Sequence, residues 1–251
     1  MTKENFLFTE DELKNMIEIT SNFLDKTSRN LESPSKFFGN ILEPTSYIED
    51  HGIPLYKFIP QEVYQNHILK GHFRLGSLKY YREIENESSK DPKEGFSNII
   101  INSGNRQIFT SLISGFDQYV FCGTYTLEES VYMSKRFGGV VIKIKNLRSF
   151  AEKIKNAIGA QKWYSMKVTY SDFKAYKVKQ LIEDLNGVGP DLSVELFHYL
   201  LSFSTVPSVF SKPARFAPEQ EIRLSFEMNK NTKRKLDICN KALLKEIELI
   251  K

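Results

Sequence analysis

The chain has 251 residues, of which 41% are hydrophobic and 26% are charged. This composition suits one globular domain with a stable core and at most a small appendage. The formal net charge of +4 is too small to indicate a dedicated nucleic-acid binder.

No segment approaches the roughly 20 consecutive apolar residues of a membrane span. The first residues, MTKENFLFTEDEL, also lack the apolar stretch of a signal peptide. The two isolated cysteines, Cys122 and Cys239, have no metal-ligand spacing and favour a reducing compartment, although one disulfide between them stays open. We therefore expect a soluble, cytoplasmic protein.

The N-terminal part of the chain is expected to be helical. Thr9–Glu12 (TEDE) has the spacing of a capping box, and Leu13, Met16 and Ile17 then follow at helical spacing. We interpret residues 1–50 as an N-terminal helical appendage and residues 51–251 as the main domain.

Strand and helix signals alternate through the next hundred residues. LYKFI (55–59) predicts a strand, PQEVYQNHILK (60–70) a helix ended by Gly71, and HFRLGSLKYY (72–81) a second strand. A charged loop, REIENESSKDPKEG (82–95), comes next. Three β-like runs follow, which are SNIIIN (97–102), RQIFTSLIS (106–114) and QYVFCGTYT (118–126).

The remaining segments complete an uneven mixture. LEESVYMSKRF (127–137) and LRSFAEKIKNAI (147–158) predict helices on either side of the strand VVIKIK (140–145). Residues 167–170 and 221–228 predict strands, and residues 172–185, 191–203 and 237–250 predict helices. Hairpins with irregularly inserted helices favour an α+β fold of mixed, largely antiparallel split sheets with peripheral helices.

Most familiar catalytic and metal-binding patterns are missing from the sequence. The four histidines lack the spacing of metal ligands, so we expect no metal site. No GxSxG, Walker A or GxGxxG motif occurs. Cys122 lies in the apolar run YVFCG, where it is either a small core residue or a nucleophile paired with a distant histidine.

Tyrosines gather in KYYRE (79–83) and in GTYTLEESVYM (123–133). Aromatic rings among basic residues can stack on a nucleobase. Tyrosine is amphipathic, however, so packing at the edge of the core is the other interpretation.

The stretch FAPEQEIRLSF (216–226) carries two glutamates, Glu219 and Glu221. Strand alternation would point both to one side, either as a solvated edge or as carboxylates facing a substrate that develops positive charge. An oxocarbenium ion fits the second case, because glycosidic cleavage passes through one. Two carboxylates on one side of a strand do not flank a bond, so we expect one carboxylate near a sugar C1′.

This pattern resembles the bi-glutamate motif of ADP-ribosyltransferases, which use NAD as a substrate. The resemblance implies that Glu221 is the catalytic carboxylate that steadies the oxocarbenium ion, and that Glu219 acts on the acceptor side. The segment LYKFIPQEVYQNHILKGHFRLGS (55–77) is similar to the strand–helix–strand start of that superfamily.

The same resemblance implies further NAD contacts. Lys57 stands where the family has an arginine or histidine, and lysine lacks both the guanidinium fork and the imidazole acceptor, so Arg74 is the alternative. Either cation would meet the pyrophosphate or ribose, and Tyr80 or Tyr125 would stack on nicotinamide. The segment VFCGTYT implies that Thr124, Tyr125 and Thr126 line the nicotinamide pocket.

The chain is also similar to a bacterial domain-of-unknown-function family with Leu-Tyr-Lys-Tyr, Asn-Asp-Pro-x-Glu and Lys…Glu-x-Glu-x-Arg motifs. The matching pieces over residues 55–225 are LYKF, KDPKEG, VYMSKRFGGVVIKI and KPARFAPEQEIRL. Lys90 replaces the family's asparagine, and Val131 replaces a tryptophan.

Two functions lead, and other enzymes, including a nuclease, also stay open. The first is transfer of ADP-ribose from NAD to a macromolecular acceptor, protein or nucleic acid, without metal or membrane; toxin or phage-defence biology is the usual setting of such enzymes. The second is a non-enzymatic module that binds RNA or a protein through KYYRE and NKNTKRK (229–235), with Glu219 and Glu221 solvated.

Overall fold

The computed structural model describes eight stretches of the chain, which are residues 53–83, 91–103, 106–115, 117–171, 174–178, 204–205, 207–229 and 233–250. The expected N-terminal appendage and the helix expected over residues 191–203 lie outside these described residues. The helices and 3₁₀ turns are α2 (Gln61–Asn66), η3 (Ile68–Lys70), α3 (Leu78–Glu83), α4 (Ser130–Phe137), α5 (Leu147–Ile158), η5 (Ala214–Glu219) and η6 (Lys241–Glu246).

The strands are distributed over the described residues. They are β1 (Leu55–Ile59), β2 (His72–Ser77), β3 (Phe96–Ser103), β4 (Arg106–Ile113), β5 (Gln118–Thr124), β6 (Val140–Ile144), β7 (Lys162–Lys167), β8 (Thr169–Tyr170), β9 (Ala175–Val178), β10 (Ser211–Lys212), β11 (Glu221–Glu227), β12 (Lys235–Cys239) and β13 (Ile247–Leu249). The mixture of helices with mostly antiparallel strands confirms the α+β expectation.

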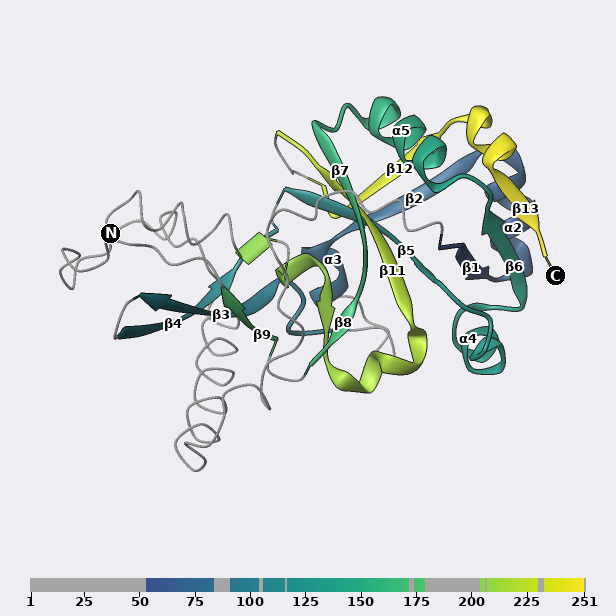
Figure 1. Ribbon diagram of the computed structural model, residues 1–251. Helices are drawn as coiled ribbons and strands as arrows, with labels where there is room; N and C mark the ends of the chain where they lie inside the picture. Colours follow the sequence, from purple (N-terminus) through teal and green to yellow (C-terminus); the bar gives the residue numbers. More distant parts are fainter. Residues whose placement is uncertain are drawn as a thin grey trace.

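An eight-stranded antiparallel sheet forms the body of the molecule (Figure 1). Its strands run in the order β12-β2-β5-β1-β6-β13, and β11 and β7 continue from the other edge of β5. β11 pairs with β5 along its whole length. On the opposite edge of β5, β2 pairs at Tyr119 and Val120, whereas β1 pairs only at Thr124. The sheet therefore splits beside β5, because β2 and β1 leave it at different ends.

Two smaller sheets lie beside this body. β4, β3 and β9 form one of them, at the left of Figure 1, and β10 pairs with β8 in the other. β9 was expected to be part of a helix over residues 172–185. It is a strand because residues 175–178 pair in parallel with β3.

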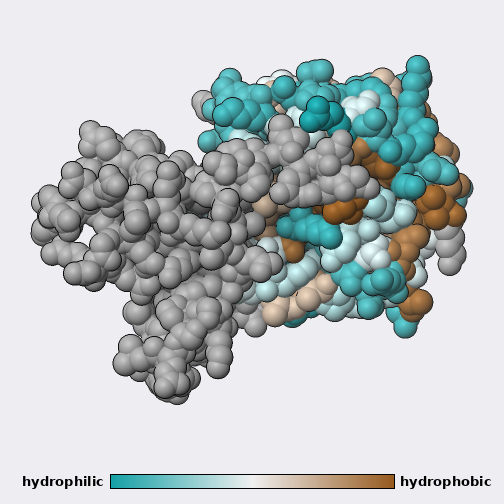
Figure 2. All heavy atoms as spheres, viewed as in Figure 1, coloured by the Kyte–Doolittle hydropathy of each residue, from teal (hydrophilic) through white to brown (hydrophobic). Residues whose placement is uncertain are grey.

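The main core lies on the face of the sheet that α5 covers (Figure 1). α5 begins where the Asn146 side chain accepts a hydrogen bond from the Ser149 amide at 2.8 Å, and it ends at Gly159, which is left-handed. Phe150 and Ile154 recur at helical spacing and are buried on the sheet. Hydrophilic residues cover the outer side of this region in Figure 2.

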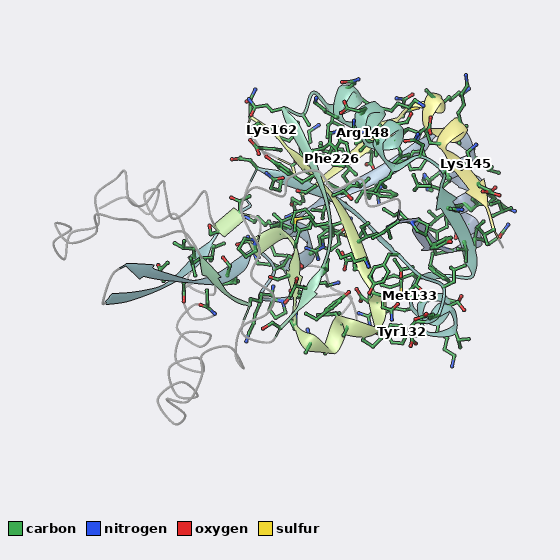
Figure 3. All side chains as sticks on the ribbon, in the orientation of Figure 1. Tyr132, Met133, Lys145, Arg148, Lys162 and Phe226 are labelled. Atoms are coloured by element: carbon green, nitrogen blue, oxygen red, sulfur yellow. The ribbon has the colours of Figure 1, made fainter. Side chains whose placement is uncertain are left out.

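Alternation along β11 divides its side chains between the two faces. Ile222, Leu224 and Phe226 belong to the main core under α5, and Phe226 is labelled in Figure 3. Glu221 and Arg223 have the opposite parity, so they point to the other face. They are nevertheless buried, because α3, α4 and the segment around β10 cover that face.

Two element predictions near strand ends were wrong. The strand expected over residues 72–81 stops at Ser77, whose hydroxyl accepts the Tyr80 amide at 3.1 Å and starts α3. The closing helix expected over residues 237–250 is instead β12, η6 and β13. Its first residues pair with β2, and Asn240 begins η6 by accepting the Ala242 amide at 3.0 Å.

The backbone of Gly138 is held where any side chain would collide. Gly138 has a φ of 113°, and an added Cβ would lie 2.3 Å from the backbone of Ile59 and Pro60. Nothing lies within 4 Å of the corresponding position at Gly139. The first glycine is required by the approach of α4 to the end of β1, whereas the second has room.

We expect Gly138→Ala to lower the free energy of unfolding by about 2 kcal/mol or more, because strain and overlap add. The matched control Gly139→Ala should change it by less than about 1 kcal/mol. Urea denaturation of both variants measures this difference. Equal midpoints for the two variants would contradict the assignment.

Candidate active site

A cavity of about 330 Å³ opens on the face opposite α5, within the size range of small-ligand sites. It lies beside the split in the sheet, between β1, β2, β5 and the start of β11. Aromatic rings from three separate segments form much of its wall, and these are Tyr56, Phe58, Tyr80, Tyr81 and Phe137. The remaining lining is strongly charged and comes from segments far apart in the sequence.

The two glutamates of the EQE stretch meet in this cavity, although strand alternation does not bring them together. Glu219 ends η5, Gln220 is left-handed with a φ of 42°, and Glu221 is the first residue of β11. Each glutamate is only 4% exposed, so the solvated-edge interpretation was wrong.

Lys212 joins the two carboxylates. Its Nζ lies 2.6 Å from Glu219 Oε2 and 2.8 Å from Glu221 Oε2. Burial alone would lower the pKa of Lys212, but the two carboxylates outweigh burial and raise it above the ordinary value. The ammonium therefore stays charged at neutral pH.

Glu221 is held in its ionised form. Its Oε1 accepts a hydrogen bond from Arg223 Nε at 2.5 Å, and its backbone amide donates to the Tyr170 hydroxyl at 2.7 Å. Burial would raise the pKa of Glu221, but Arg223 and Lys212 together hold it far below its usual range. A carboxylate has about four acceptor positions, so the bonds from Lys212 and Arg223 leave capacity for a ligand.

Glu219 titrates in the opposite sense. Burial raises its pKa, the nearby Glu221 adds to this effect, and Lys212 offsets only part of it. Its Oε1 lies 3.2 Å from Arg136 Nη2, but the geometry of that ion pair is not that of a hydrogen bond. This oxygen therefore keeps an unused capacity to accept a proton or a hydrogen bond.

Arg223 extends the charge cluster to a distant loop. Its terminal nitrogens lie 2.6 and 3.2 Å from the two carboxylate oxygens of Glu94, and Nη1 also donates to the Val209 carbonyl. We call Glu94, Arg136, Lys212, Glu219, Glu221 and Arg223 the ion network. Its three carboxylates face three cations, so the buried charge is balanced.

Sequence reasoning did not assign roles to several members of the ion network. Glu94 belongs to KDPKEG, and Lys212 and Arg223 belong to KPARFAPEQEIRL, which are motif pieces of the second resemblance. Their shared occurrence in those motifs was the available signal. Arg136 belongs to another such piece, VYMSKRFGGVVIKI, whereas Tyr170 lies outside these pieces and only the fold brings it close to Glu221.

Lys57 lines the cavity, but its ammonium has a partner within the protein. Lys57 Nζ donates to the Cys122 carbonyl at 2.6 Å, in the gap that β1 and β2 leave along β5. It also lies 4.8 Å from the centre of the Phe121 ring. Burial lowers the pKa of Lys57. This lysine therefore closes the split in the sheet as well as facing the cavity.

Arg74 and Tyr80 also line the cavity. Arg74 is exposed and its Nε lies 2.6 Å from Asp237 Oδ1, on the neighbouring strand β12. The ring of Tyr80 packs beneath the ammonium of Lys235 at 4.4 Å. Because Arg74 is exposed and Tyr80 is half-buried, these residues mark a solvent-facing end of the cavity.

The expected nicotinamide-pocket residues Thr124, Tyr125 and Thr126 are not part of the cavity lining. The Thr124 hydroxyl is directed to the backbone carbonyls of Thr126 and Gln220, at 3.1 and 3.2 Å. The Tyr125 ring packs against the ammonium of Lys167 at 4.0 Å. These three residues therefore shape the turn after β5, and of the predicted set the cavity gathers Lys57, Arg74, Tyr80, Glu219 and Glu221.

Two negative observations apply to the described parts of the chain. There, no three histidine, cysteine, aspartate or glutamate residues gather as a metal site would require. None of the helices in the same ranges is long and apolar enough to cross a membrane.

No family model, curated protein or solved structure matches the chain. Any function must therefore be argued from the cavity and its residues.

The opposite pKa shifts of the two glutamates predict two separate pH effects on folding. The lowered pKa of Glu221 gives stability that is present above pH 4.5 and is lost as the pH falls further. The raised pKa of Glu219 works the other way, because stability is lost as the pH rises from 4.5 through its folded-state pKa.

Denaturant unfolding between pH 3 and pH 8 would separate these effects. Glu221→Gln should flatten the acid loss below about pH 4.5, and Glu219→Gln should remove the gain on acidification above it. Each group contributes at most about 1.4 kcal/mol per pH unit. If both variants keep the wild-type pH profile, the burial and pairing described above are wrong.

The two thiols should differ sharply in reactivity. Burial raises the pKa of Cys122 to about 12, so roughly one molecule in ten thousand carries the thiolate at pH 8. Cys239 is exposed. We expect a maleimide to label one thiol per native chain at pH 8, lost in Cys239→Ser and retained in Cys122→Ser. Rapid labelling of Cys122 in the native protein would contradict its assignment as an inert wall residue.

Proposed function

We propose that this chain is an NAD-consuming enzyme of the ADP-ribosyltransferase kind, which transfers ADP-ribose to a macromolecular acceptor. The observation that carries the proposal is the position of Glu221, a buried, ionised carboxylate at a cavity of about 330 Å³. Cleavage of the bond between ribose C1′ and nicotinamide builds positive charge on the sugar. A fixed carboxylate beside that sugar stabilises the transition state more than the ground state.

The two glutamates suit two different steps. Glu221 is kept ionised by Lys212 and Arg223, and its free acceptor positions can bind a ribose hydroxyl. Glu219 has a raised pKa and an oxygen without a hydrogen-bond donor, which suits a base that removes a proton from the acceptor. The ligand would place its sugar between them and its nicotinamide against the aromatic wall.

The solvent-facing end of the cavity suits the phosphates. Arg74 presents a guanidinium there, which can bind a pyrophosphate in addition to Asp237. Tyr80 lines the cavity and would stack on a flat ring of the ligand, and Lys57 lines it with its ammonium bound to the Cys122 carbonyl. A cytoplasmic setting and a toxin or phage-defence role belong to the same proposal.

The RNA-binding alternative has less support in KYYRE. Arg82 of that cluster is buried, and its Nη1 donates to the Glu94 carbonyl at 2.7 Å. Tyr80 and Tyr81 both line the cavity. The cluster therefore contributes to the cavity wall, which leaves Lys79 as its exposed cation.

The test is consumption of labelled NAD by wild type and by Glu221→Gln. The amide keeps the shape of the side chain but removes its charge, so we expect kcat to fall roughly 100- to 1000-fold. The matched control is Glu246→Gln, which neutralises another carboxylate held by a lysine, Lys153, outside the cavity. This control should keep the wild-type rate.

Two results would overturn the proposal. One is a folded wild-type protein that neither binds NAD nor consumes it with any candidate protein or nucleic-acid acceptor. The other is an unchanged rate in Glu221→Gln. Binding of RNA that weakens steeply with salt and ignores Glu221→Gln would support the alternative.

A further inference from the structure

Glu94 lies on a loop whose conformation is fixed from several sides. Asp91 forms a fully buried ion pair with Lys174, with 2.9 Å between Oδ2 and Nζ. The Asp91 amide donates to the Tyr81 carbonyl, and Arg82 holds the Glu94 carbonyl at 2.7 Å. These contacts hold the loop in place, and the side chain of Glu94 lines the cavity.

The carboxylate of Glu94 accepts hydrogen bonds from both terminal nitrogens of Arg223. These contacts measure 2.6 Å for Nη1 and 3.2 Å for Nη2. Arg223 is 2% exposed, and its Nε is directed to Glu221 at 2.5 Å. One guanidinium therefore bridges two carboxylates, with its fork committed to Glu94.

Because Arg223 bonds both Glu94 and Glu221, its contacts with Glu94 affect the orientation of the Glu221 carboxylate. A guanidinium has five donors, and buried donors without acceptors are costly. If Glu94 lost its charge, the terminal nitrogens would turn to the nearest remaining carboxylate, which belongs to Glu221. That change would rotate Glu221 toward Arg223 and use the acceptor positions that face the cavity.

We propose that Glu94 is a positioning residue for Glu221, acting through Arg223. Its effect on catalysis rests on the proposed function, but the linkage itself does not. Glu94 would set the direction of the Glu221 carboxylate and keep its free oxygen positions open toward the sugar. Glu94 also lines the cavity, so direct contact with the ligand is the competing explanation that the test must separate.

The test is a double-mutant cycle of Glu94→Gln and Arg223→Gln, with kcat and KM for NAD as readouts. Because misplacement of a reacting group by about 1 Å can lower the rate about 100-fold, we expect Glu94→Gln to lower kcat about 100-fold. The KM for NAD should stay within about twofold. In the Arg223→Gln background, Glu94→Gln should have no further effect on kcat.

Two conservative variants protect the test against simple misfolding. Glu94→Asp keeps the charge on a shorter side chain and should recover part of the lost kcat. Arg223→Lys keeps the charge but lacks the fork, so it should lower kcat as Glu94→Gln does. A raised KM in Glu94→Gln with unchanged kcat would mean direct ligand binding, and an equal loss of kcat in both backgrounds would exclude action through Arg223. Either result overturns the proposal.

A second cycle needs no activity and separates this inference from the proposed function. Glu94→Gln and Glu221→Gln should each lower the urea midpoint, and their combined shift should be larger than the sum of the single shifts, because each single variant leaves Arg223 one carboxylate and the double variant leaves it none. Additive shifts would show that the two carboxylates are not linked, which overturns the inference even if NAD is consumed. If NAD is not consumed but the shifts are non-additive, the proposed function fails and the linkage stands.

Discussion

Balance of buried charge is the constraint that organises this molecule. Moving a charged side chain out of water costs several kcal/mol even after relaxation, so every buried carboxylate needs a cation close by. Lys212 satisfies Glu219 and Glu221 together, and Arg223 satisfies Glu221 and Glu94. The loop around Glu94, the strand β10 and the start of β11 must therefore converge, since none of them can bury its charge alone.

The charged segments converge beside the split in the sheet. β5 pairs with β11 along one edge, and β2 and β1 share the other edge with a gap between them. The Lys57 ammonium fills that gap by bonding to the Cys122 carbonyl. Tyr56, Thr124 and Glu221 pair in one row across β1, β5 and β11, and the first and last of them line the cavity. The Glu221 carboxylate at the start of β11 consequently faces a cavity and not a second layer of apolar packing.

Local signals predicted part of this structure, and long-range contacts decided the rest. β1 and α5 follow their sequence patterns and caps, because those signals are contained in a few neighbouring residues. The segment after Asp237 has a helical pattern but pairs with β2, which no local pattern reveals. Glu219 and Glu221 were recognised as a pair, whereas the contact of Glu94 with Arg223, across 129 residues, required the fold.

Stability alone does not explain the ion network. Buried ion clusters can often be replaced by well-packed apolar side chains without loss of stability, so balanced charge alone does not account for them. The aromatic residues that line the cavity could provide such packing. Glu221 nevertheless lines the same cavity, and Arg223 and Lys212 keep its carboxylate ionised by lowering its pKa. An ionised acceptor next to an apolar wall is what a cationic transition state requires. The positive charges of Lys212 and Arg223 also reduce the negative potential that Glu221 creates in the cavity. Because Arg223 shares its charge between Glu221 and Glu94, this reduction is smaller than if it paired with Glu221 alone.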